Sequence, residues 1–87
     1  MALLDGNALA GPLVELLGWD ATASIIRCTH CGARGALASV VVYASPMGSV
    51  ARCAGCDAVL LTLVDAPDGR GWVGMPGLDA LEVRRDR

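Results

Sequence analysis

Cys28-Thr29-His30-Cys31 and Cys53-Ala54-Gly55-Cys56 are two CxxC motifs that together hold all four cysteines of the 87-residue chain, and residues 32 to 52 separate them. Each CxxC motif can form a tight turn, or knuckle, that points two sulfur atoms to the same side. The intervening segment is long enough to form a hairpin that brings the two knuckles face to face. This spacing is typical of a tetrahedral zinc site. The predicted metal ligands are Cys28, Cys31, Cys53 and Cys56.

Three other cysteine chemistries compete with zinc at this spacing. Iron is the main competitor, because a tetrahedral four-sulfur site suits either ion, and an iron site would make the protein an electron carrier. Two disulfides are disfavoured by the intracellular location that we expect. A thioredoxin-like dithiol needs a helix that begins at the CxxC motif, whereas the residues after Cys31, Gly32-Ala33-Arg34-Gly35, predict a turn.

The residues around the knuckles add three expectations. Arg27 and Arg52 each precede a first cysteine, where they either lower the electrostatic cost of four thiolates or face water. Gly32 and Asp57 follow the second cysteines, at a position that often needs a left-handed backbone. His30 is expected to be an exposed knuckle residue, because four cysteines already complete the coordination sphere.

The composition predicts one small domain over residues 1–87. It is 54% hydrophobic and only 18% charged, which favours collapse into a core. That core lacks bulky anchors, since Phe is absent and the aromatic residues are only Trp19, Tyr43 and Trp72. A small domain of this kind usually needs a disulfide, a metal or a partner to stabilise it.

An N-terminal helix is predicted over residues 5–18. Asp5 can cap it, four leucines recur at helical spacing, and Gly18 can end it. Pro12 removes one backbone hydrogen bond, so the helix either is kinked or begins near Gly11. Whether it packs on its own chain or on another stays open. The four leucines are Leu9, Leu13, Leu16 and Leu17.

A four-cysteine ribbon is predicted over residues 23–75, followed by a C-terminal edge strand and tail over 76–87. Turn signals at 45–48 and 66–69 separate short β-type runs. The fold class is therefore a small α+β metal-binding domain with zinc-ribbon or rubredoxin-like antiparallel hairpins and an N-terminal helix. The expected strands lie at 25–26, 37–43, 50–52, 59–64 and 70–73.

Composition and motifs also exclude several classes of function. A net charge of −2 argues against a general nucleic-acid binder, although Arg27, Arg34 and Arg52 cluster near the knuckles. The N-terminal residues do not predict a secretory signal, and the apolar runs are too short to cross a bilayer, so we expect a cytoplasmic protein. The chain carries no convincing catalytic motif, and we expect no enzymatic activity.

Leu4-Asp5-Gly6-Asn7-Ala8-Leu9-Ala10-Gly11 and the two CxxC pairs give the chain a resemblance to a small uncharacterised family of actinobacterial proteins, domain of unknown function 6510. The resemblance covers nearly the whole chain and implies a zinc ribbon. The genes of that family are expected near genes similar to flavin-dependent ferredoxin reductases and molybdenum oxidoreductases. The resemblance thus implies a redox accessory role.

The leading hypothesis is a non-enzymatic ribbon with a structural zinc site that serves as an interaction or accessory module for a protein partner. The apolar N-terminal helix and the aromatic-poor core motivate it. A rubredoxin-like iron electron carrier or redox accessory protein is the first alternative, and a weak nucleic-acid-binding ribbon is the second. A homo-oligomer also stays open.

Overall fold

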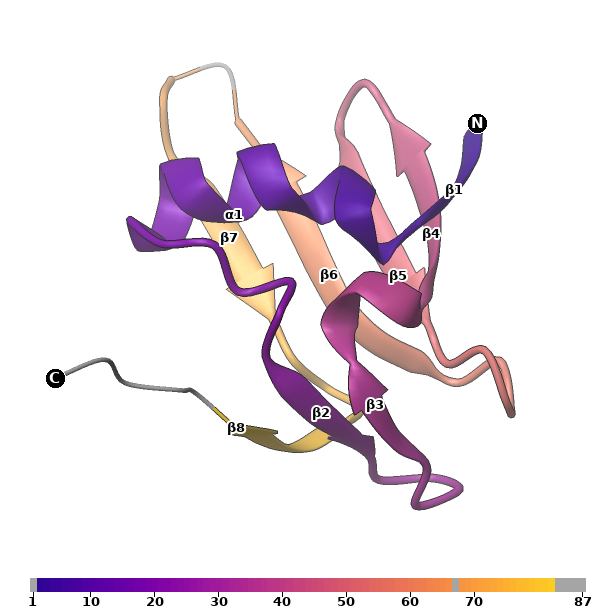
Figure 1. Cartoon of the computed structure of the whole chain (residues 1–87). Coiled ribbons are helices and arrows are strands. Elements are labelled where there is room, and N and C mark those ends of the chain that lie inside the picture. Colours follow the sequence, from indigo (N-terminus) through magenta and orange to yellow (C-terminus); the bar gives the residue numbers. More distant parts are fainter. Residues whose placement is uncertain (1, 67, 83–87) are drawn as a thin grey trace, which may run out of the picture.

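Two antiparallel sheets and one short helix make up the computed structural model, which describes residues 2–66 and 68–82 (Figure 1). The chain is thus a small α+β protein. The larger sheet has the order β1 (Ala2–Asp5), β4 (Val41–Ser45), β5 (Gly48–Arg52), β6 (Val59–Asp65) and β7 (Gly71–Gly74). The smaller sheet has the order β3 (Arg34–Ala36), β2 (Ile25–Cys28) and β8 (Leu78–Glu82).

The N-terminal helix is shorter than predicted. Asp5 does cap a turn, since its Oδ1 accepts a hydrogen bond from the Asn7 N–H at 3.0 Å, but that turn is the 3₁₀ segment η1 (Gly6–Leu9). The α-helix α1 spans Ala10–Leu17. Pro12 therefore lies in its first turn, where its missing N–H leaves no helical hydrogen bond unmade. The left-handed Gly18, with φ of 85°, ends the helix as predicted.

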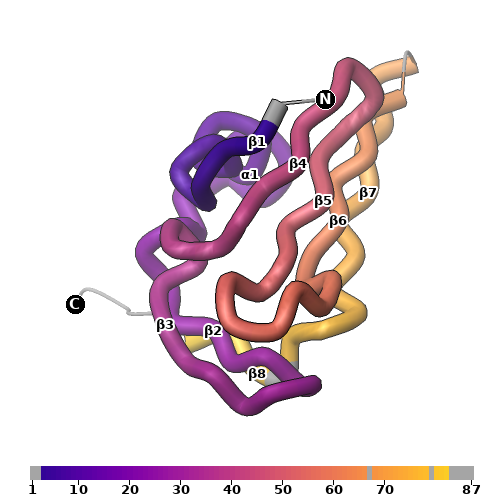
Figure 2. Tube along the Cα trace, turned by 90° about the vertical axis from the view of Figure 1, so that its right-hand side faces the viewer, coloured from indigo at the N-terminus to yellow at the C-terminus, as the bar shows by residue number. Residues whose placement is uncertain are grey.

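The helix packs on its own chain, which settles the question that the sequence left open. Leu9 and Leu13 are completely buried against the larger sheet, and Figure 2 shows α1 lying along one side of it. With eight residues, α1 is far too short to cross a bilayer, and no helix of the described residues meets that requirement.

Two strands fall where the sequence predicted none. The first, β1, pairs with β4 and ends at the capping Asp5. The second, β3, pairs with β2 and precedes η2 (Leu37–Ser39), a 3₁₀ segment that replaces the predicted start of a strand at Leu37. The N–H groups of Leu37 and Ala38 bond the carbonyls of Ser24 and Thr22, each at 2.9 Å, which takes them out of a strand ladder.

The predicted C-terminal edge strand is present as β8, which pairs with β2, while residues 83–87 of the predicted tail lie outside the described residues. The core is built from leucine, valine and small residues. None of the aromatic side chains is fully buried, because Tyr43 is half-buried while Trp19 and Trp72 are 39% and 50% exposed. The expectation of a core without bulky anchors is confirmed.

Candidate metal site

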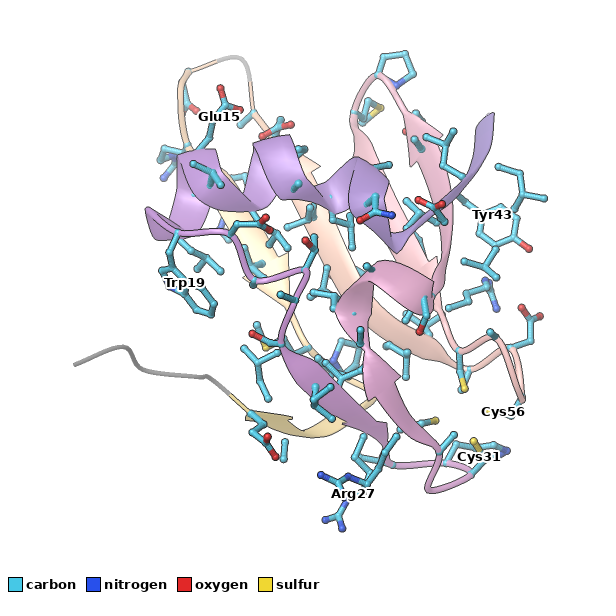
Figure 3. The ribbon with its side chains drawn as sticks, in the orientation of Figure 1. Glu15, Trp19, Arg27, Cys31, Tyr43 and Cys56 are labelled. Carbon is cyan, nitrogen blue, oxygen red and sulfur yellow. The ribbon has the colours of Figure 1, made fainter. Side chains whose placement is uncertain are left out.

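Each CxxC motif forms the turn of a hairpin, one in each sheet. Cys28 is the last residue of β2, and the first knuckle leads into β3. Cys53 follows β5 directly, and the second knuckle leads into β6. In the sequence the motifs are distant, but in space the two turns meet at one end of the molecule (Figure 3).

The two knuckles share one backbone geometry. The Cys28 N–H donates to the Ala33 carbonyl, and the Gly32 N–H donates back to the Cys28 carbonyl, both at 2.9 Å. The second knuckle repeats this pattern, with Cys53 donating to Ala58 at 2.9 Å and Asp57 donating to Cys53 at 2.8 Å. Local hydrogen bonds therefore fix the direction of the sulfurs in each half.

The left-handed residue predicted after each CxxC motif is present. Gly32 has φ of 76° and Asp57 has φ of 66°. Glycine adopts this conformation without steric strain, and aspartate tolerates it better than most other residues. The two sequence positions thus have the same structural role, although their side chains differ.

All four sulfur atoms lie within 4.8 Å of one another. The Cys28 and Cys56 sulfurs are 3.6 Å apart, and the Cys31 and Cys53 sulfurs are 3.7 Å apart. Four ligands at about 2.3 Å from a tetrahedral centre would be about 3.8 Å from one another. The sulfur–sulfur distances therefore fit a tetrahedral metal ion, and the four cysteines could hold one.

The thiols of Cys28 and Cys56 have different pKa values. The backbone N–H groups of Cys31 and His30 bond to the Cys28 sulfur and lower its pKa to about 7, with burial acting in the opposite direction. The Ala58 N–H favours the Cys56 thiolate, but burial and the neighbouring sulfurs outweigh it and raise the pKa of Cys56 to about 12. Thiolates this close repel one another, and a divalent cation supplies the charge that lets all of them ionise.

The cluster is buried on one side and open on the other. Cys28 and Cys53 are 2% and 6% exposed, whereas Cys56 is half-buried and Cys31 is exposed. An apolar groove of about 130 Å³ runs beside the two buried sulfurs. His30 is exposed, as predicted, and lies outside the cluster.

Arg52 supports the second knuckle directly. Its Nη1 donates to the Asp57 carbonyl at 3.0 Å and lies 3.7 Å from the Asp57 carboxylate. Its guanidinium also lies 5.8 Å from the centre of the Tyr43 ring. Arg52 therefore holds the left-handed residue of its knuckle in place. Arg27, before the first knuckle, is exposed and lies at the same end of the molecule as Cys31 (Figure 3).

Gly77 joins the first knuckle to the second hairpin, a role that the sequence analysis missed. Its carbonyl accepts the Thr29 N–H at 2.9 Å, and its own N–H donates to the Leu60 carbonyl at 3.3 Å. A Cβ atom at Gly77 would overlap the Val59 carbonyl oxygen and come within 3.0 Å of the Leu60 Cα. The sequence offered one signal, the Pro76-Gly77 pair, which we interpreted only as a break between elements.

Fold and site together define a small α+β protein with a four-cysteine cluster able to hold a metal ion. The chain belongs to a family of unknown function, DUF6510, whose model matches residues 1–86. The resemblance seen in the sequence is thereby confirmed. Neither the curated proteins nor the solved structures contain a significant match to this chain.

The N-terminal motif that carries part of the resemblance has a structural role. Asp5 caps η1, and Leu9 is buried in the core. Gly6 packs so closely on η2 that a Cβ atom there would overlap the Leu37 carbonyl oxygen. Gly6 therefore joins the N-terminal segment to the chain that follows the first knuckle, while Asp5 and Leu9 shape and bury that segment.

Proposed function

We propose that the protein is a non-enzymatic module of the zinc-ribbon type, in which Cys28, Cys31, Cys53 and Cys56 hold one structural zinc ion. The observation that carries the proposal is the spacing of the four sulfurs, with pairs at 3.6 and 3.7 Å. Two knuckles of the same backbone geometry, each at the turn of a hairpin, support the ribbon assignment.

The arrangement of the ligands favours a structural ion over a catalytic one. Four protein sulfurs complete a tetrahedral sphere and leave no open position for a substrate. Each sheet supplies two ligands, so one ion would connect the two sheets. Zinc in comparable peptides contributes about 10–16 kcal/mol of apparent binding free energy, which exceeds the stability of many small domains.

The module would serve a protein partner through its larger sheet. The N-terminal helix had suggested such a role, but its apolar side packs against its own sheet. The opposite side of that sheet carries exposed apolar side chains, among them Trp72 at 50% exposure. Exposed apolar patches of this kind mark interaction surfaces.

The metal proposal is tested by elemental analysis and by matched knuckle variants. We expect one zinc per chain in protein purified without affinity-tag metals. Cys31→Ser and Cys56→Ser should lose the metal and the cooperative unfolding transition, because three thiolates hold zinc less well. His30→Ala is the control, since His30 is an exposed knuckle residue outside the cluster. Cysteine variants that fold normally without metal would refute the structural role.

An iron electron carrier is the second candidate, and the exposure of Cys31 favours it, because an electron-transfer centre must lie near the surface. Backbone N–H groups also bond the sulfurs of Cys28 and Cys56, and such bonds tune the potential of iron–sulfur centres. One iron per chain, with visible absorption that bleaches on reduction, would make electron transfer the better-supported function and refute the zinc proposal. A colourless, redox-silent protein would eliminate it.

Nucleic-acid binding receives less support. Two of the arginines near the knuckles lie beside acids, Arg34 at 3.4 Å from Glu82 and Arg52 at 3.7 Å from Asp57. Phosphate binding depends on cations available to the backbone of the nucleic acid. We therefore expect no salt-dependent binding of DNA or RNA in a fluorescence anisotropy titration.

A further inference from the structure

The side of the larger sheet that faces away from α1 forms a continuous surface, which we call the outer sheet face. The register pairs Leu3 with Tyr43, Tyr43 with Val50, and Val50 with Thr62 across four neighbouring strands. The alternate positions on these strands point into the core. The outer sheet face consists of Leu3, Val41, Tyr43, Val50, Thr62, Val64 and Trp72.

No helix or strand covers this face within residues 2–66 and 68–82, and Figure 2 shows α1 on the opposite side of the sheet. An antiparallel sheet with one solvated side usually alternates apolar inward and polar outward residues. Here most of the outward side chains are apolar as well, with Leu3 65%, Val64 42% and Trp72 50% exposed, while Ser45, Arg52 and Thr62 are the polar residues among them. Solvent alone does not account for such a composition.

The outer sheet face has two shallow grooves over β4, β5 and β6. A groove of about 380 Å³ lies beside the β4–β5 turn, where it is lined by Met47, a side chain that is 74% exposed. A second groove of about 410 Å³ reaches Asp57 beside the second knuckle. Tyr43 and Val50 line both grooves, so the two are neighbours on this face.

Each of the two arginines at the ends of the outer sheet face lies beside an acidic side chain. The Arg52 guanidinium lies 5.8 Å from the Tyr43 ring centre and 3.7 Å from the Asp57 carboxylate. The Arg70 guanidinium lies 5.4 Å from the Trp72 ring centre, and its Nε is 3.0 Å from the Asp68 carboxylate. With each cation beside an acid, the face does not select an acidic or basic partner, and two copies of it would not repel each other.

We propose that the outer sheet face packs against the same face of a second copy of the chain, forming a two-fold symmetric dimer. The inference rests on the proposed interaction role but not on the identity of the metal. The most exposed apolar side chains offer on the order of 400 Å². The half-buried residues and the aliphatic stems of the arginines raise this toward the roughly 800 Å² that one partner contributes to a standard interface.

The chemistry of the face agrees with a self-complementary interface. Homodimer interfaces are more apolar than other protein–protein interfaces, and their energetic centres are enriched in Trp, Tyr and Arg. Trp72 and Tyr43 supply such anchors, and the arginines stacked over their rings are already partly ordered. Two sheets packed face to face lie about 10 Å apart, close enough to exclude water from both grooves.

A matched pair of valines provides the test. Val64 on the outer sheet face and Val14 on α1 are 42% and 43% exposed, so lysine at either site should leave the fold intact. Sedimentation equilibrium of the full chain with its native metal should give twice the monomer mass for the wild type. Val64→Lys should weaken dimerisation by about 100-fold or more, because it buries an unpaired charge. Val14→Lys should leave dimerisation unchanged.

A second measurement does not depend on a substitution in the face. Trp19→Phe leaves Trp72 as the single tryptophan. Its fluorescence should shift to shorter wavelength as the protein concentration rises through the dimerisation range. A wild type that stays monomeric at millimolar concentration would overturn the proposal and assign the face to a different protein. Equal dissociation of both lysine variants would overturn it too. The metal content of the same samples reports separately on the zinc proposal.

Discussion

Replacing Gly77 by alanine would separate the two hairpins that supply the cysteines without changing any cysteine. The new Cβ atom would overlap the Val59 carbonyl oxygen, which is backbone and cannot move aside as a flexible side chain would. Gly77 and β6 must therefore move apart. The shift would break or lengthen the bond from the Thr29 N–H to the Gly77 carbonyl and the bond from the Gly77 N–H to Leu60.

The expected loss follows from these contacts. Overpacking in a close contact costs about 1–3 kcal/mol, and two weakened backbone hydrogen bonds add about 1 kcal/mol each when lost. We therefore expect Gly77→Ala to lower the free energy of unfolding of the metal-loaded protein by about 2–4 kcal/mol. Zinc affinity should fall by about 10- to 100-fold, as when a group that orients metal ligands is removed.

Guanidinium denaturation and zinc competition with a chromogenic chelator would measure the two effects. Gly55→Ala is the matched control, because Gly55 lies inside the second knuckle but its Cβ atom would meet only the Cys53 sulfur at 3.8 Å. The control should resemble the wild type in both assays. If Gly77→Ala also resembled the wild type, the backbone hydrogen bonds of Gly77 to Thr29 and Leu60 would have no part in holding the cluster together.

Two further predictions concern the N-terminal segment and the thiols. Gly6→Ala should destabilise the protein by about 2–3 kcal/mol, because the new Cβ atom would overlap the Leu37 carbonyl oxygen. Gly11→Ala should stabilise it by about 0.5–1 kcal/mol, because Gly11 lies in α1 with open space around it. Equal effects of the two variants in thermal unfolding would contradict the packing argument. Zinc binding should release protons, since Cys56, with a pKa of about 12, is protonated at neutral pH and Cys28, with a pKa of about 7, is partly so. Apparent affinity should therefore rise with pH and fall as pH drops through 7. Calorimetry in buffers of different ionisation enthalpy would count the released protons, and no proton release or an affinity independent of pH would contradict the prediction.

The cysteine cluster could be predicted because its determinants are local. A CxxC turn fixes two sulfurs through hydrogen bonds within six residues, and the left-handed positions at Gly32 and Asp57 can be recognised from residue type. The gathering of the four sulfurs then needed only one long-range assumption, that the segment between the motifs brings the two CxxC turns face to face. That assumption agrees with the structure.

The parts that were missed depend on contacts between distant segments. The strand propensity of residues 2–5 is weak, and β1 becomes a strand only because β4 offers it a partner. Leu37 lies in an apolar run that predicts a strand, but bonds to Thr22 and Ser24 draw its segment into a turn. Gly77 contacts the first knuckle and β6, and its neighbour Pro76 signals a break in the chain but neither of these contacts.

The division of the ligands between two hairpins also bears on how the chain folds. Each knuckle closes a short loop, so either hairpin can form early and offer two sulfurs to an ion. The other pair arrives only after a longer loop is closed, at an entropic cost that an ion already held by one hairpin helps to offset. Folding would then proceed through an ion held by half of its ligands. The concentration of the free ion during synthesis would then affect the rate of folding as well as the final stability.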